Sequence, residues 1–103
     1  MKLVAVTACP TGIAHTYMAA EQLEGQAQKM GFSIKVETQG AMGIENELGQ
    51  DDIDKAAAVI FAAGIAVQKA ERFEGKKIFE FSVQEAIKNP EKILQKVKEE
   101  VGG

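Results

Sequence analysis

The sequence predicts an α/β fold: a four-stranded parallel sheet with helices on both faces, in a Rossmann-like or flavodoxin-like three-layer sandwich. Three observations support this class. Short apolar runs rich in β-branched residues alternate with segments of helical periodicity. These runs are apolar at nearly every position, as strands buried on both faces are. With 103 residues, of which 46% are hydrophobic, the chain suits one domain spanning residues 1–103, ending in a linker-like Gly102-Gly103.

Each expected element has a local signal. The apolar runs predict strands at residues 3–7, 32–38, 57–62 and 77–81. The helical pattern predicts helices at residues 14–30 and 67–73, and two more that begin at Ser82 and Pro90. Ser82 and Glu85 form a capping box, and Asn89-Pro90 places an N-cap residue before a first-position proline. Residues 39–52 contain three glycines and predict a long loop with a turn of helix near Asn46.

The composition excludes several classes of protein. The net charge is -3, with 15 acidic and 12 basic residues and no basic block, which disfavours nucleic-acid binding. No apolar run approaches the roughly 20 residues of a membrane helix, so we expect no direct membrane insertion. Cys9 is the only cysteine, which excludes a disulfide scaffold and suits a reducing cytoplasm.

One segment carries residues suited to chemistry. It follows the first strand and opens the first helix, at the edge where open α/β sheets bind ligands. The unpaired N–H groups and dipole of the helix start form an anion site, and the same dipoles stabilise a thiolate. We therefore expect Cys9 to attack phosphorus and form a phosphocysteine. The expected phosphate-binding loop comprises Pro10, Thr11, Gly12, Ile13, Ala14, His15 and Thr16.

Two residues of this segment admit more ordinary interpretations. Cys9 could be a small buried hydrophobe, although its proline, threonine and glycine neighbours are uncommon in a core. His15 could donate to a phosphoryl oxygen, hold the thiolate or carry the phosphoryl group itself. It could equally be a solvent-facing residue of the first helical turn. No clustering of histidine, cysteine and acidic residues predicts a metal site, and no motif predicts a cofactor.

The spacing invites comparison with a hydrolase. In tyrosine phosphatases and related arsenate reductases, a cysteine and five residues precede an arginine with serine or threonine. Here His15-Thr16 stands at that place, and the sole arginine, Arg72, lies in another segment. The bidentate clamp on phosphate is therefore missing, as is the Asp-Pro pair of an acid that protonates the leaving group. The loop is suited to accepting a phosphoryl group and keeping it from water.

Several motifs together resemble one known family. The run from Val4 to Glu21, VAVTACPTGIAHTYMAAE, closely resembles the active-site segment of the IIB component of the fructose family. That family belongs to the bacterial phosphoenolpyruvate-dependent sugar phosphotransferase system. Further similar stretches are VETQG at residues 36–40, GIENEL at 43–48 and ERFEGK at 71–76. Many family members carry an aspartate after the third strand, where this chain has Ala63-Gly64-Ile65-Ala66.

The resemblance implies a cytoplasmic phosphocarrier, associated with the membrane through a partner. Cys9 matches the family's phosphorylated cysteine, which implies that Cys9 rather than His15 carries the phosphoryl group. The donor would be a phosphohistidine of the IIA component. The acceptor would be a sugar held by the membrane-embedded IIC component, with fructose as the default. The family fold, a parallel four-stranded sheet covered on both faces, agrees with the periodicity.

Three other functions remain as alternatives. One is a low-molecular-weight phosphatase-like hydrolase that uses Cys9. Another is a regulatory module that docks to proteins according to its phosphorylation state. A flavin or nucleotide binder fits less well, because the Gly-rich dinucleotide spacing is absent. A carrier also needs an apolar docking rim, for which Ile13, Tyr17 and Met42 are candidates, unless Tyr17 and Met42 are core residues.

Overall fold

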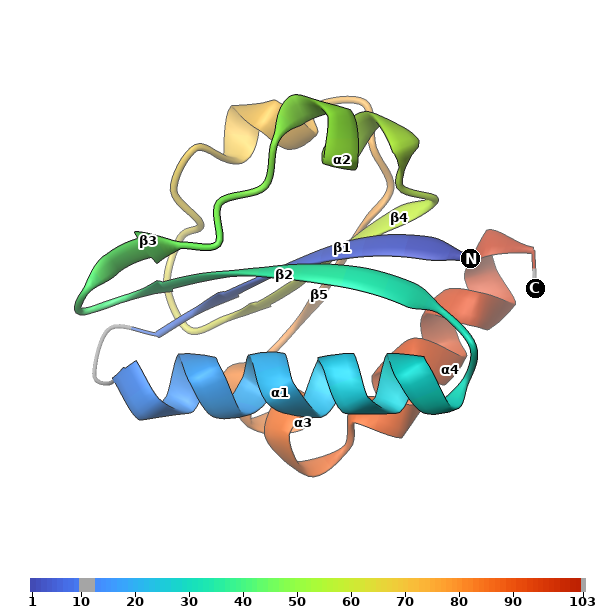
Figure 1. Ribbon diagram of the computed structural model, residues 1–103, viewed down its shortest axis with the longest axis horizontal. Helices are drawn as coiled ribbons and strands as arrows, with labels where there is room; N and C mark the ends of the chain where they lie inside the picture. The colour runs from blue at the N-terminus through green and yellow to red at the C-terminus, as the bar shows by residue number, and fades with distance from the viewer. Residues whose placement is uncertain (10–12, 103) are drawn as a thin grey trace.

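The computed structural model describes residues 1–9 and 13–102, in which a five-stranded sheet lies between two layers of helices (Figure 1). The strand order is β3-β2-β1-β4-β5. The strands are β1 (Lys2–Ala8), β2 (Ser33–Gly40), β3 (Gly43–Glu45), β4 (Ala58–Ala63) and β5 (Ile78–Phe81). The helices are α1 (Ile13–Lys29), α2 (Gln50–Lys55), the 3₁₀ helix η1 (Ala70–Phe73), α3 (Val83–Lys88) and α4 (Pro90–Val101).

The expected fold class is confirmed, but the sheet has one strand more than the sequence predicted. The four expected strands are parallel, whereas β3 is antiparallel to β2. It lies in the segment that was expected to be a loop with a helical turn near Asn46. Gly40 pairs with Gly43 around a two-residue turn, and Gly43 adopts a φ of +90° that suits glycine. The 67–73 helix is also shorter than expected and reduces to η1.

Two helical layers cover opposite faces of the sheet (Figure 1). α1, α3 and α4 pack on one face, and α2 and η1 lie over the other. Successive strand residues point to opposite faces, so Leu3 and Ala5 enter the core beside α1 while Val4 and Val6 pack with Phe73 of η1. The central strands are thus buried on both sides, which explains their continuous apolar runs.

The start of α3 confirms the capping box. The Ser82 hydroxyl accepts a hydrogen bond from the Glu85 N–H at 3.1 Å, and the Glu85 carboxylate accepts one from the Ser82 N–H at 3.0 Å. These bonds satisfy two polar groups at the helix terminus. Ser82 follows β5 directly, so the cap fixes α3 at the carboxyl edge of the sheet.

β1 lies at the centre of the sheet, and its carboxyl end is a topological switch point. β1 pairs with β2 on one side and with β4 on the other, so the connections leave this end in opposite directions. Such a divergence leaves a crevice where α/β proteins bind ligands. Cys9 follows β1 at this point. The fold therefore places the sole cysteine at the position that favours a binding site.

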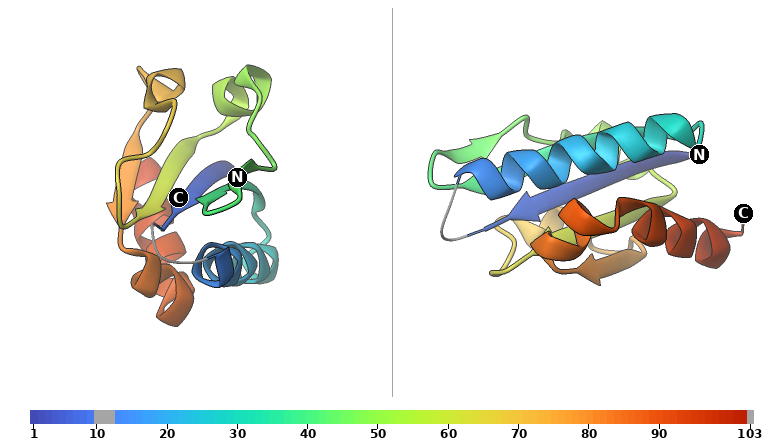
Figure 2. Two further views of the ribbon diagram at one scale, coloured as in Figure 1. Left: turned by 90° about the vertical axis from the view of Figure 1, so that its left-hand side faces the viewer. Right: turned by 90° about the horizontal axis from the view of Figure 1, so that it is seen from below.

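The two ends of the described chain lie at the opposite edge of the sheet. β1 begins there at Lys2, and α4 runs back from α3 toward the same edge. Lys77, just before β5, pairs with Glu100 of α4 at 3.9 Å, which joins the end of this helix to that edge. Figures 1 and 2 show the two ends side by side and distant from the carboxyl end of β1. Among the described helices, none has the length and hydropathy of a bilayer-spanning segment.

Candidate functional site

Cys9 is held between the carboxyl ends of two neighbouring strands. Its N–H donates to the carbonyl of Gln39 in β2 at 3.2 Å. On the other side, the Gly64 N–H, just after β4, donates to the carbonyl of Ala8 at 2.9 Å. Cys9 is 8% exposed and packs with the core beside α1, so it is more buried than its sequence neighbours suggested. Its backbone is therefore fixed by the sheet, which positions the thiol.

A hollow of about 440 Å³ opens beside Cys9. His15 and Met18 line it from the first turns of α1, and Gly64 lines it from the segment after β4. The remaining wall comes from the start and outer face of α3: Ser82, Val83, Gln84, Ile87 and Lys88. The surface of the hollow is largely apolar, although His15, Ser82, Gln84 and Lys88 add polar and charged groups.

The expected phosphate-binding loop is described in part. Pro10, Thr11 and Gly12 lie outside the described residues, and Ile13 is described only as the first residue of α1. Ala14 and His15 are exposed, whereas Thr16 is buried, with its carbonyl accepting a hydrogen bond from the Thr7 hydroxyl at 3.1 Å. This bond fastens the first turn of α1 to β1. His15 thus lines the hollow from a solvent-accessible position.

The α3 wall is the part of the site that motif reasoning missed. The signal was present, because the capping box places the start of α3 directly after the last parallel strand. In a parallel sheet the carboxyl ends of all strands meet at one edge, so α3 had to begin near Cys9. Lys88 in this wall adds a cation to the lining of the hollow.

Arg72 is engaged away from the hollow, on the other face of the sheet. Its Nη1 and Nη2 atoms donate to Oε1 and Oε2 of Glu37 at 2.8 and 3.0 Å, a bidentate ion pair. The Glu37 side chain is 0% exposed and that of Arg72 13%. In the β1–β2 register Glu37 stands opposite Val6, whose side chain enters the core beside η1, whereas Cys9 packs on the α1 side. The only arginine is therefore not a clamp for phosphate at Cys9.

The Glu37 carboxylate is fully satisfied despite its burial. Besides Arg72, it accepts hydrogen bonds from the Leu48 N–H at 2.8 Å and from Gln39 Nε2 at 2.7 Å. Burial raises the pKa of Glu37, but these hydrogen bonds together outweigh it and hold the pKa below the ordinary value of 4.5. Glu37 is therefore an ion at neutral pH.

Gln39 links this buried network to the segment after β4. Its side chain donates from Nε2 to the Gln68 carbonyl at 3.1 Å and accepts at Oε1 from the Gln68 N–H at 2.8 Å. Its own carbonyl receives the Cys9 N–H. One residue thus connects the cysteine, the buried carboxylate and the neighbouring segment. No local sequence motif indicates these contacts.

Exposed apolar side chains gather on elements around the carboxyl edge. Tyr17 is 39% exposed and Met42 68%, so both are surface residues and not core. Met18, which lines the hollow, and Ile65, close to Gly64 in the chain, are exposed as well. The Tyr17 hydroxyl donates to Glu45 of β3, a contact that raises the pKa of Tyr17 above 10.0. This contact connects α1 with the β2–β3 hairpin.

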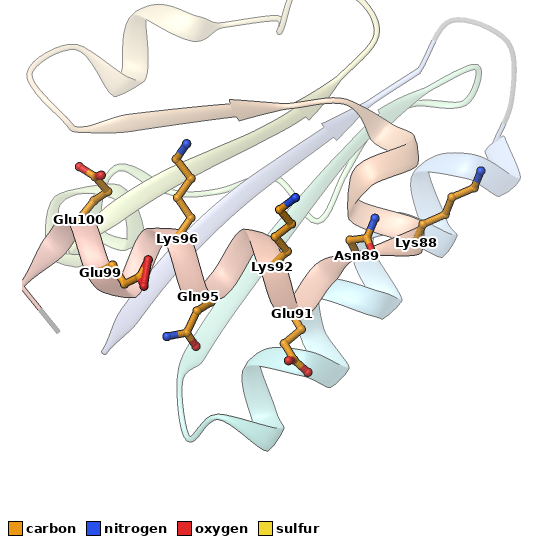
Figure 3. Close-up of a pocket in the computed structure, with 8 residues that line it drawn as sticks. All are labelled: Lys88, Asn89, Glu91, Lys92, Gln95, Lys96, Glu99 and Glu100. Atoms are coloured by element: carbon orange, nitrogen blue, oxygen red, sulfur yellow. The ribbon is translucent and has the colours of Figure 1, made fainter.

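A second and larger hollow of about 850 Å³ lies along α4 and contrasts with the first (Figure 3). Its side chains come from the end of α3 and from α4 alone. Figure 3 shows lysine and glutamate side chains leaving the helix in different directions rather than converging. It is therefore a charged helix surface without the features of a reaction site. In the part of the chain that the structure describes, no three histidine, cysteine or acidic residues come together as metal ligands.

An open parallel α/β domain with a cysteine at its switch point and a helix start beside it defines a class of ligand-binding domain. Comparisons with known proteins identify the family within this class. Residues 4–96 match the family model described as "PTS system, Lactose/Cellobiose specific IIB subunit". "PTS system fructose-like EIIB component 2" of Escherichia coli (strain K12) is 48% identical over 96 residues, covering 93% of this chain and 91% of that protein.

Solved structures agree with these sequence matches. A domain from the fructose-specific IIABC component of Borrelia burgdorferi superposes with a TM-score of 0.88 at 49% identity, covering 92% of this chain and 90% of that one. The Enzyme IIB subunit of the PTS from Escherichia coli K12 gives a TM-score of 0.92 at 43% identity, covering 97% and 93%. The chain belongs to the IIB subunits of the sugar phosphotransferase system (PTS), which act in phosphoryl transfer during sugar uptake.

Proposed function

We propose that this chain is a cytoplasmic phosphocarrier in which Cys9 accepts a phosphoryl group from a phosphohistidine of a IIA component. Cys9 then transfers the group to a sugar bound by a membrane IIC component. The observation that carries this proposal is the position of Cys9 at the carboxyl end of the central strand, beside a hollow lined by α1 and α3. Family membership supports both partners.

The chemistry consists of two displacements at phosphorus. In the first, the Cys9 thiolate attacks, the P–S bond forms, and the P–N bond to the histidine of the IIA component breaks. The imidazole leaves with the electron pair and takes up a proton. In the second, a sugar hydroxyl attacks, the O–P bond forms, and the P–S bond breaks as a base beside the sugar in the IIC component takes the hydroxyl proton. The thiolate is thereby regenerated.

The surroundings of Cys9 suit a carrier that must not hydrolyse its cargo. The thiol is nearly buried, and the apolar side chains of Met18, Val83 and Ile87 line the hollow beside it without supplying a group that could activate water. The loop of residues 10–16 is the proposed cradle for the phosphoryl oxygens. The occupation of Arg72 by Glu37 disfavours the phosphatase-like alternative, because that reaction relies on an arginine clamp.

The same edge is the proposed docking face for both partners. Transient interfaces need an apolar centre, and the exposed side chains of Tyr17, Met18, Met42 and Ile65 supply apolar surface at this edge. Donor and acceptor must reach the same sulfur, so they bind in turn and not together. The relatives' names support fructose as the sugar, whereas the family model's description names lactose and cellobiose.

Label transfer from a phosphorylated IIA component tests this function. We expect the wild-type chain to retain one phosphoryl group, which mass spectrometry locates on Cys9 at neutral pH. Cys9→Ser removes the nucleophile and should retain no label. His15→Ala removes the other candidate phosphoryl acceptor of the hollow and should still be labelled on Cys9, at a lower rate because His15 belongs to the proposed cradle. A label on His15, or release of free phosphate without retention, would contradict the carrier function.

A further inference from the structure

The network around Glu37, Gln39 and Arg72 extends beyond the sheet into two connecting segments. Five backbone hydrogen-bonding groups outside the network's own residues converge on it. Glu37 accepts from the Leu48 N–H, and Arg72 donates to the carbonyls of Leu48 and Lys69 at 3.3 and 2.9 Å. The Gln39 side chain donates to the carbonyl of Gln68 and accepts from its N–H. The network therefore ties together the loop after β3 and the segment between β4 and η1.

The Gln39 side chain holds the segment after β4 by a pair of hydrogen bonds. Its amide group bonds to both the backbone N–H and the backbone carbonyl of Gln68, as the backbone of a neighbouring strand would. Arg72 adds a further contact to the Gln68 carbonyl at 3.3 Å. Next to it, Lys69 has a φ of 57°, a left-handed conformation that a residue other than glycine adopts at a cost. The segment is thus held in a conformation that the surrounding bonds determine.

The segment from Gly64 to Gln68 borders the hollow beside Cys9. It is fastened at its start by the Gly64 N–H bond to Ala8 and at its end by the Gln39 side chain. Gly64 lines the hollow, and Ile65 is exposed beside it. The network thus fixes one end of a segment whose other end, at Gly64, forms part of the wall of the hollow.

The network also acts directly on the cysteine. The carbonyl that receives the Cys9 N–H belongs to Gln39, whose side chain is fixed by Glu37 Oε2 and Gln68. The network is therefore linked to the backbone of Cys9 through one hydrogen bond. Displacing a reacting group by about 1 Å is enough to slow a transfer step strongly.

We propose that Glu37, Gln39 and Arg72 are positioning residues that set the place and reactivity of the Cys9 thiol from the opposite face of the sheet. This inference rests on the proposed function for its consequence in phosphoryl transfer. It assigns the buried ion pair a role in the reaction rather than in the fold alone. None of the three residues touches the phosphoryl group.

Two variants test this role while retaining a folded chain. Gln39→Leu removes the side-chain grip on Gln68 but keeps the backbone carbonyl that receives the Cys9 N–H. The double variant Glu37→Met with Arg72→Leu replaces the ion pair by apolar side chains, an exchange that often leaves stability unchanged. Val97→Ala in α4 is the control, because this buried residue lies outside the network and lowers stability without touching it.

Two readouts separate positioning from stability. At a temperature where all variants are folded, we expect both network variants to slow transfer from a phosphorylated IIA component about tenfold or more. We also expect the pH profile of Cys9 alkylation by iodoacetamide to shift. The Val97→Ala control should match the wild type in both. Network variants that behave like this control would overturn the inference.

The two readouts also separate this inference from the proposed function. Alkylation requires no partner protein, so it reports on the thiol even if the wild-type chain accepts no phosphoryl group. A wild type that is not labelled contradicts the carrier function, while a shifted alkylation profile in the variants still supports positioning. If the network variants show neither a shifted pH profile of Cys9 alkylation nor a slower phosphoryl transfer, the positioning role is rejected and the carrier function is unaffected.

Discussion

At the scale of single residues, Glu37 shows what the sequence could and could not reveal. An acidic residue in the interior of a buried strand requires a partner, because an unpaired buried charge is too costly. Arg72 is the only arginine, yet it lies 35 residues away, and nothing local indicates that the two meet. Cys9 was identifiable because its proline, glycine and histidine neighbours lie within the same loop. Local signals single out Cys9 as the proposed nucleophile, whereas the contacts among Glu37, Gln39 and Arg72 depend on the tertiary fold.

The Glu37–Arg72 pair predicts a large loss of stability when one partner is removed. Glu37→Gln should lower the free energy of unfolding by about 3–5 kcal/mol, because the guanidinium of Arg72 then remains nearly buried without its counter-ion. Urea unfolding followed by circular dichroism measures the change. Lys35→Ala breaks the exposed pair with Asp52 and should cost about 1 kcal/mol or less. Equal losses in the two variants would show that burial of the pair has no energetic consequence.

At the scale of elements, the sequence prediction was wrong where a tight turn, and not the period of the hydrophobic residues, determines the structure. β3 has three residues, too few to show any hydrophobic period, so glycines around it indicated a loop. α3 was anticipated despite its six residues, because its start carries a capping box with a defined hydrogen-bond pattern. Short elements are thus predictable when a side chain caps them and difficult when only backbone pairing forms them.

Two glycines on different elements predict opposite effects of the same substitution. Gly43→Ala should lower the free energy of unfolding by about 1 kcal/mol or more, because its φ of +90° disfavours an L side chain. Gly25→Ala in α1 should raise it by up to about 1 kcal/mol, since alanine favours the helix. Neither added Cβ meets an atom within 4 Å, so conformation alone decides. Thermal unfolding of both variants measures the difference, and equal signs would contradict it.

At the scale of the whole molecule, the class of fold followed from alternation of apolar runs and helical patterns. Four parallel strands with helices on both faces fix where a site must lie, because only the carboxyl edge at β1 offers a switch point. The sequence placed Cys9 at that edge. The walls of the hollow could not be predicted, because α3 and the segment after β4 come together beside Cys9 only in the folded chain.

The whole molecule should also lose stability in acid through one buried group. The pKa of Glu37 lies below 4.5 in the folded chain, so its contribution is fully present above about pH 4.5. It is lost as the pH falls through the lower folded pKa, because the unfolded chain then binds the proton more readily. We expect the difference in unfolding free energy between wild type and Glu37→Gln to shrink on acidification. A difference that stays constant across this range would contradict the assignment.

The placement of both termini at the edge away from Cys9 has a consequence for tethering. A second domain joined at the N-terminus starts at the far end of β1 from Cys9, and the seven residues of this strand span about 23 Å at roughly 3.3 Å per residue. A linker that carries its own end to the thiol therefore needs about seven residues when fully extended. A flexible linker needs about 18 residues for this span to equal its average reach. A partner on a shorter tether can present to Cys9 only a surface that lies away from its point of attachment.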